Sequence, residues 1–111
     1  MVAAYPALVE FLEILRKNTN EYFAKHYHRD DPVILLVVPT FTAHVGRKYF
    51  KIVTDNGTQR SVHCFVDARG NVYKAAGWTA PAKGVRYNLF NADDMLKLRT
   101  VDGHHSGYLY R

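Results

Sequence analysis

The first 26 residues place apolar side chains at helical spacing. Charged residues such as Glu13 and Lys17 fall on the opposite side, and the apolar residues recur every three or four positions, at Leu8, Phe11, Leu12, Leu15, Tyr22 and Phe23. Pro6 suits a first helical turn, where its missing N–H is not needed. The pattern predicts an amphipathic helix over about residues 6–26, with its apolar stripe covering one side of a sheet. A surface helix that binds a partner is the alternative.

The pattern then changes to one typical of strands. Val33 to Val38 is apolar on both faces, which predicts a central strand that stops at Pro39. Phe41 to Val53 predicts one long strand, bent by a bulge near Gly46. The pair Asn56-Gly57 is a strong turn signal because both residues readily adopt positive φ.

Residues 60–78 form the stretch around which we expect the fold to be organised. Ser61 to Val66 alternates, with His63 and Phe65 on one face and Val62, Cys64 and Val66 on the other. A loop rich in turn-forming residues follows at 67–71, and an extended pattern resumes at 72–75. Two such runs joined by about five residues with a glycine predict an antiparallel hairpin.

The last third of the chain predicts a short helix and a closing strand. Asn91 is a good N-cap and acids follow it, which predicts a helix near residues 91–96. Tyr108 to Arg111 alternates and predicts an edge strand that returns to the sheet. One helix and about five bent antiparallel strands indicate a single domain over residues 1–111, with a small five-stranded barrel over about residues 33–111.

Positive charge is concentrated in the middle of the chain. The formal net charge is +5, and residues 44–88 hold eight Lys or Arg against two Asp, which is +6. A basic surface attracts polyanions, with nucleic acid first among them. The alternative is that the charge only keeps a small domain in solution.

Cations, aromatic rings and an amide lie close together after the hairpin. Cations follow a phosphate backbone, aromatic rings stack on unpaired bases, and amides read base edges. We therefore expect a single-stranded nucleic-acid site at Lys74, Trp78, Lys83, Arg86, Tyr87 and Asn88. In the competing interpretation, Trp78 is a core residue that locks its loop onto the sheet.

Other chemistry finds little support in the sequence. The lone Cys64 excludes an internal disulfide and fits a reducing, cytoplasmic compartment. His63 and Cys64 are strand neighbours that point to opposite faces, so they are not expected to act as a base and a nucleophile. His26 and His28 lack the spacing of zinc ligands, and the glycine-flanked loop of His104 and His105 gives that pair no fixed geometry. We expect no enzyme activity, no metal, no cofactor, no transmembrane helix and no secretory signal.

Residues 47–90 resemble a family of small uncharacterised proteins from bacteriophage and marine environmental sequences. The shared pattern is clearest in CFVDARGNVYKAAGWTAPAKGVRYN: a Phe-Val-Asp strand end, a glycine turn, then Lys-Ala-Ala-x-Trp-x-Ala-Pro-Ala-Lys and a following Arg. A phage origin would place the protein in the cytoplasm of a bacterial host.

The order of one helix and five strands is similar to the Sm/Lsm-like fold. The signatures of that family have loose counterparts in Asp67, Asn71 and the Lys83-Gly84 pair. The similarity implies a preference for RNA and a homo-oligomer formed through edge strands, for which Tyr108 to Tyr110 is the expected edge. The alternative function is a phage structural or adaptor protein that acts through protein–protein association.

Overall fold

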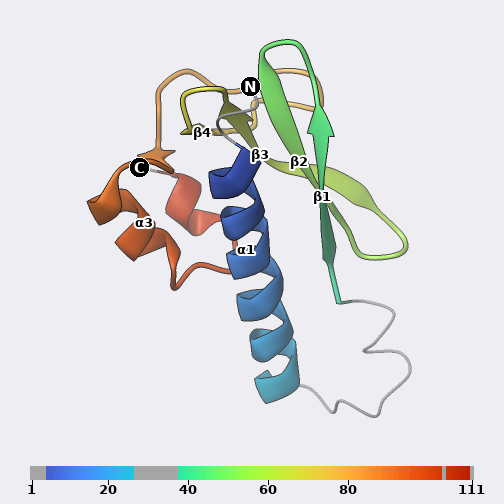
Figure 1. The fold of residues 1–111 in the computed structure, drawn as a ribbon. Coiled ribbons are helices and arrows are strands. Elements are labelled where there is room, and N and C mark those ends of the chain that lie inside the picture. The colour runs from blue at the N-terminus through green and yellow to red at the C-terminus, as the bar shows by residue number, and fades with distance from the viewer. Residues whose placement is uncertain (1–4, 27–37, 104, 111) are drawn as a thin grey trace.

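The N-terminal helix α1 spans Tyr5–His26 and confirms the helix predicted from periodicity. The computed structural model describes residues 5–26, 38–103 and 105–110 (Figure 1). The apolar stripe of α1 is buried, with Phe11 and Leu15 at 0% exposure. The helix lies across one face of the sheet, as its amphipathic pattern requires.

The sheet has five antiparallel strands, each paired with its neighbours in sequence. The strands are β1 (Thr40–Val45), β2 (Tyr49–Asp55), β3 (Arg60–Asp67), β4 (Asn71–Lys74) and β5 (Tyr87–Asn88). Among the described strands, β1 and β5 lie at opposite edges and do not pair, so the sheet is open. The mixed architecture and the antiparallel sheet are therefore as predicted, whereas a closed barrel and an Sm-like fold are not confirmed.

The single bent strand predicted over Phe41 to Val53 is wrong. The chain reverses there, and β1 and β2 form a hairpin in which Val45 pairs with Phe50. The Gly46 N–H donates to the carbonyl of Tyr49 at 2.9 Å, which closes the turn. A Cβ at Gly46 would lie 2.9 Å from that carbonyl oxygen, so the glycine permits a tight turn where a bulge was expected.

The two later hairpins confirm their turn signals. Gly57 has φ +92° in the β2–β3 turn and Gly70 has φ +80° in the β3–β4 turn, a region in which glycine is not strained. The Asp67 carboxylate closes the second turn by accepting hydrogen bonds from the backbone N–H groups of Arg69 and Asn71, both at 2.9 Å. These turns fix the register of β3 against both of its neighbours.

The alternation predicted for β3 is interrupted by a bulge at His63. Ile52 pairs with Cys64 and Val53 pairs with Val62, so His63 has no partner on β2. Its ring lies 5.9 Å from that of Phe41, and its Nε2 is hydrogen-bonded to the hydroxyl of Tyr108. The bulge thus connects the sheet to the C-terminal segment.

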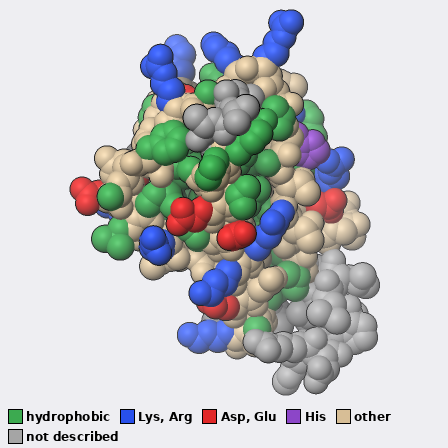
Figure 2. Space-filling model, in the orientation of Figure 1, with side chains coloured by type: hydrophobic (Ala, Val, Ile, Leu, Met, Phe, Trp, Pro, Cys, Tyr) green, Lys and Arg blue, Asp and Glu red, His purple; other side chains and the backbone are tan. Residues whose placement is uncertain are grey.

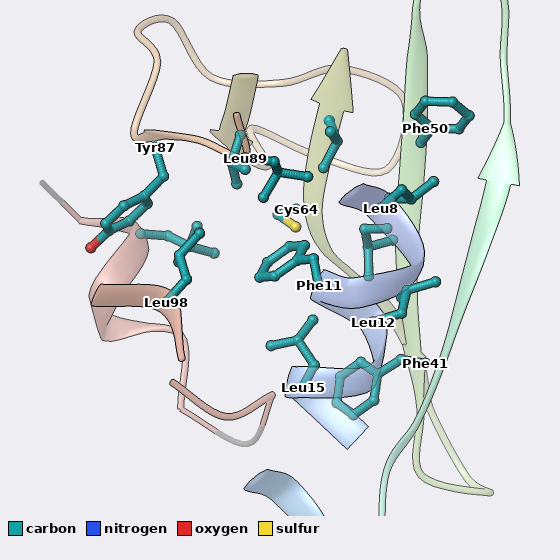
Figure 3. Packing of buried hydrophobic residues seen from close by; sticks show 14 of the residues in the cluster. Leu8, Phe11, Leu12, Leu15, Phe41, Phe50, Cys64, Tyr87, Leu89 and Leu98 are labelled. Atoms are coloured by element: carbon teal, nitrogen blue, oxygen red, sulfur yellow. The ribbon is translucent and has the colours of Figure 1, made fainter. Parts of the chain in front are cut away.

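The core lies between α1, the sheet and the C-terminal elements (Figure 3). The short helix α3 (Ala92–Leu98) confirms the predicted one, with Asn91 Oδ1 accepting from the N–H of Asp94 at 3.0 Å. The edge strand predicted from Tyr108 is wrong, because Gly107–Leu109 forms the 3₁₀ helix η2. Leu109 is 1% exposed, and its burial in the core explains why this segment does not extend along the sheet.

Polar side chains of α1 hold the segment that follows α3. Asn18 Nδ2 donates to the carbonyls of Arg99 and Val101 at 2.8 and 2.7 Å. The hydroxyl of Thr19, a fully buried residue, accepts from the N–H of Gly103 at 2.8 Å. The strand predicted at Val33 to Val38 lies outside the described residues except for Val38, which is not in a strand.

Replacement of Gly103 by Ala should destabilise the protein through overpacking. A Cβ at this position would lie 1.8 Å from the ring of Phe41, which is 1% exposed and cannot move aside freely. We expect a loss of about 1–3 kcal/mol in urea unfolding. Gly107→Ala is the matched control, because no atom lies within 4 Å of its Cβ position. Equal unfolding midpoints for the two variants would contradict this packing.

The stability of the protein should fall at mildly acidic pH because of His63. Burial lowers the pKa of His63 to about 4, against an opposing influence of the Asp102 carboxylate. The unfolded chain binds this proton below pH 6.5, whereas the folded protein resists it until about pH 4. Stability is therefore fully present above pH 6.5 and declines by about 3 kcal/mol as the pH falls toward 4.

This pH dependence can be measured by urea unfolding at a series of pH values. His63→Asn removes the titrating group, so the difference in stability between wild type and variant should shrink as the pH falls through this window. A difference that stays constant with pH would show that His63 is not the responsible group.

Candidate nucleic-acid interface

The face of the sheet turned away from α1 carries the candidate site. Lys51 lies on β2 between Phe50 and Ile52, and both neighbours belong to the core cluster that packs under α1. Successive side chains of a strand point to opposite faces, so Lys51 projects from the other side. The same reasoning places Phe65 of β3 there. We call this surface the outer face and define it by Tyr49, Lys51, Phe65, Tyr73 and the Trp78 ring that lies over it.

Three aromatic rings from three strands contact one another on the outer face. The ring centroid of Tyr49 lies 5.9 Å from that of Phe65 and 5.7 Å from that of Tyr73, both with edge-on geometry. Phe65 is 2% exposed, whereas Tyr49 and Tyr73 are half-buried. The Tyr73 hydroxyl donates to Asp67 Oδ2 at 2.9 Å, which fixes that ring. On the outer face, Tyr49 and Tyr73 are therefore two partly exposed rings beside the buried ring of Phe65.

Trp78 is an exposed ring flanked by two cations. Its side chain is 48% exposed, so it is a surface residue and not the core residue of the competing interpretation. Lys51 Nζ lies 4.7 Å and Arg60 Cζ lies 5.9 Å from the ring centroid, within the range of cation–π contacts. The Trp78 loop is closed by a bridge between Ala75 and Pro81. The loop thus holds the ring beside cations of β2 and β3.

The two acids within residues 44–88 are already engaged. Asp55 accepts from the N–H of Gly57 at 2.8 Å and lies 3.9 Å from the Arg60 guanidinium. Partial burial tends to raise the pKa of Asp67, but hydrogen bonds from Asn71, Tyr73 and Arg69 outweigh it and hold that pKa below its usual value. Both carboxylates accept hydrogen bonds from turn backbone groups. The segment has eight Lys or Arg against these two Asp, so its net charge is +6.

Positive side chains also gather beyond the outer face. Figure 2 shows several Lys and Arg side chains that project together at the end of the molecule where the β1–β2 turn lies in Figure 1. Arg47 and Lys48 of that turn are exposed, as is Arg69 in the β3–β4 turn. These exposed cations add to the positive charge of the sheet region, and long polyanions are attracted to a basic surface.

The six residues predicted for the site do not share one surface. Trp78 lies on the outer face, and Lys83 is exposed in the loop before β5. Lys74 pairs with Cys64 across the inner face, and its ammonium lies 4.4 Å from the ring centroid of Tyr110. Lys74 and Trp78 therefore project from opposite faces of the sheet.

The other three predicted residues hold the structure together. Arg86 Nε donates to the carbonyl of Leu109 at 2.8 Å, and its Nη1 donates to that of Lys83 at 2.9 Å. Tyr87 is 7% exposed and donates its hydroxyl to the Tyr108 carbonyl. Asn88 Nδ2 donates to Asn71 Oδ1 at 2.7 Å and to the Arg69 carbonyl at 3.0 Å. These side chains bond to the backbone or to another side chain and are not arranged to read bases.

Tyr49, Arg60 and Tyr73 were missed from the sequence, whereas the basic residues Lys48, Lys51 and Arg69 could be read from it either as an extension of the predicted site or as a solvated strand face. A signal existed, because Tyr49, Lys51 and Val53 alternate with Phe50 and Ile52. That alternation shows which side chains share a face of the sheet only when β1 and β2 are recognised as separate strands joined at Gly46. It is also necessary to know which face α1 covers.

The described residues offer no competing metal or membrane feature. They contain no helix long and apolar enough to cross a membrane. They also contain no group of three or more His, Cys, Asp or Glu placed to hold a metal ion. Burial raises the pKa of the Cys64 thiol well above its usual range, so this thiol remains protonated inside the core.

Comparison with known proteins places the chain in a family without assigning an activity. No curated protein and no solved structure matches it. A family of unknown function (DUF7717) matches residues 3–111, nearly the whole chain. This agrees with the resemblance to an uncharacterised family that the sequence suggests. The chain is a member of DUF7717, a family of unknown function.

Proposed function

We propose that the protein binds single-stranded nucleic acid, with RNA favoured, on the outer face. The observation that carries the proposal is the exposed Trp78 ring, which has the cationic groups of both Lys51 and Arg60 within about 6 Å of its centroid. An unpaired base can stack on the indole while the neighbouring phosphates meet the two cations. One nucleotide would then contact all three side chains at once.

The energetics favour Trp78 as the anchor of this contact. Base–aromatic stacking contributes about 1–3 kcal/mol per base, and it tolerates any base because every base has a π-face. Lys51 and Arg60 would contact phosphates and so add affinity without sequence preference. Tyr49 and Tyr73 lie on the same face as Lys51 and offer ring edges for the next nucleotide.

A preference for RNA rests on two supports. Single-stranded RNA is commonly recognised on an antiparallel sheet whose aromatic side chains stack splayed bases, which is the arrangement proposed for the outer face. The second support is the order of one helix and five antiparallel strands, which agrees with a relation to Sm-like proteins. We propose that relation as a topological one, because the described sheet is open. We propose binding without catalysis, in the cytoplasm.

A second candidate is a phage adaptor or structural protein that associates with itself or with another protein. Figure 2 shows hydrophobic side chains gathered on the face that carries α1 and α3. Val9, Phe90 and Leu96 are more than half exposed. In addition, β1 pairs with β2 along one edge and with no other described strand along its second edge. A strand edge of this kind can pair with a strand of another chain. The edge expected at Tyr108 to Tyr110 contains no strand, so β1 takes its place in this candidate.

Trp78→Ala should weaken the binding of a short single-stranded RNA by roughly 5- to 100-fold, the equivalent of the lost stacking energy. Lys51→Ala should weaken binding and reduce the salt slope by about 0.7, the value for one phosphate contact on a single strand. Fluorescence anisotropy over a salt series measures both effects. RNA and DNA oligomers of the same sequence test the preference for RNA.

Lys97→Ala is the matched control, because Lys97 is an exposed cation on α3. It should leave both affinity and salt slope unchanged. Wild-type affinity in Trp78→Ala would remove the outer face as the binding site. If the wild type binds no oligomer at low salt, the adaptor function is favoured. Analytical ultracentrifugation would then measure the oligomeric state of the protein.

A further inference from the structure

A polar cavity lies on the side of the sheet opposite the outer face. It has a volume of about 270 Å³ and lies between the inner sides of β2–β4 and the C-terminal segment. Its described lining residues are Thr54, Ser61, Val62, His63, Lys74, Ala75, Gly103, Ser106, Leu109 and Tyr110. Drug-sized ligands occupy about 300–1,000 Å³, so this cavity suits a smaller molecule.

Hydrogen-bond donors dominate the lining. Three residues that carry hydroxyls, Thr54, Ser61 and Ser106, line the cavity from three segments, and Lys74 adds an ammonium group. No Asp or Glu is among the described lining residues, and no ion pair of Lys74 is found with any described residue. A ligand that accepts hydrogen bonds and carries negative charge would complement these groups.

His63, another lining residue, supplies a further donor. The residue is 6% exposed, and its Nε2 is hydrogen-bonded to the Tyr108 hydroxyl. Burial keeps the imidazole neutral by lowering its pKa to about 4, and burial also raises the pKa of the Tyr108 phenol. Tyr108 therefore keeps its proton and can donate it to Nε2, which leaves the imidazole proton on Nδ1.

Nδ1 of His63 is available to a ligand. It forms no hydrogen bond with a described residue. In the described part of the chain, every fully buried polar side-chain atom has a hydrogen-bond partner, so Nδ1 is not fully buried. Nδ1 must therefore reach solvent, and the cavity that His63 lines provides it. The Asp102 carboxylate influences His63 electrostatically, by tending to raise its pKa. That carboxylate accepts a hydrogen bond from the backbone N–H of His105 at 2.8 Å and also contacts the His105 ring.

Tyr110 contacts Lys74 in the lining of the cavity. The Lys74 ammonium lies 4.4 Å from the Tyr110 ring centroid, and this ring is 68% exposed. The cation–π contact restrains a flexible side chain without neutralising its charge, so less entropy is lost when an anion binds.

We propose that this cavity binds a small phosphate monoester such as a sugar phosphate. The phosphate would accept hydrogen bonds from Lys74 and the hydroxyls, while a sugar hydroxyl accepts from His63 Nδ1. A phosphate presents three terminal oxygens and matches these donors better than the two oxygens of a carboxylate. The site is separate from the outer face and does not depend on nucleic-acid binding there.

Ribose 5-phosphate is the first probe, with ribose as the uncharged control, and isothermal titration calorimetry is the measurement. We expect saturable binding of the phosphate ester and none of ribose at the same concentration. Lys74→Met keeps the aliphatic stem and should weaken binding at least about tenfold, since a charged hydrogen bond is lost. Lys83→Met removes an exposed lysine outside the cavity and should bind like wild type.

An NMR titration of the histidine ring nitrogens gives a second readout that does not require a core variant. Ribose 5-phosphate should shift the His63 signals, and Ser106→Ala, which removes an exposed hydroxyl that caps no helix, should weaken that response. The proposal is overturned if ribose 5-phosphate does not bind at millimolar concentration, if ribose binds equally well, or if Lys74→Met retains wild-type affinity. Trp78→Ala should leave the binding of ribose 5-phosphate unchanged, so the proposal for the cavity and the proposal for the outer face are tested independently.

Discussion

Burial of the α1 stripe against one face of the sheet is the interaction on which the other features depend. Phe11 and Leu15 of α1 belong to the same hydrophobic cluster as Ile52 of β2 and Cys64 of β3, and all four residues are fully buried. A meander of short strands has little stability until one of its faces is covered. Because α1 covers the inner face, the alternating residues of β2 and β3 are divided between a core and a surface, and the chemistry of the outer face follows from that division.

Local patterns predicted the elements better than they predicted the site. The α1 stripe, the Asp67 to Asn71 hairpin and the Asn91 cap are all encoded by neighbouring residues, and all three are present in the structure. Gly46 was misread because a bulge and a tight turn both use glycine within a β-rich run. The segment at Tyr108 alternates like a strand, but burial of Leu109 in the core outweighs that preference.

The functional residues could be recognised only when both faces of the sheet were known. Trp78 and Lys74 are four positions apart, yet they serve opposite sides of the molecule, because a loop carries Trp78 round to the outer face. Tyr87 and Asn88 have the composition of a base-reading site, but their polar groups hold the chain together. The bulge at His63 has no residue signature in the sequence, since it is a property of the pairing between two strands.

The hydrogen bonds from α1 to the segment after α3 have a consequence for folding. Every strand pairs with its sequence neighbour, so the sheet can form by closing short loops, which is fast and costs little entropy. The bonds from Asn18 to Arg99 and Val101, by contrast, join residues 81 and 83 positions apart. Because contacts of such long sequence separation close the largest loops, we expect the docking of the C-terminal segment onto α1 to be the slowest part of folding.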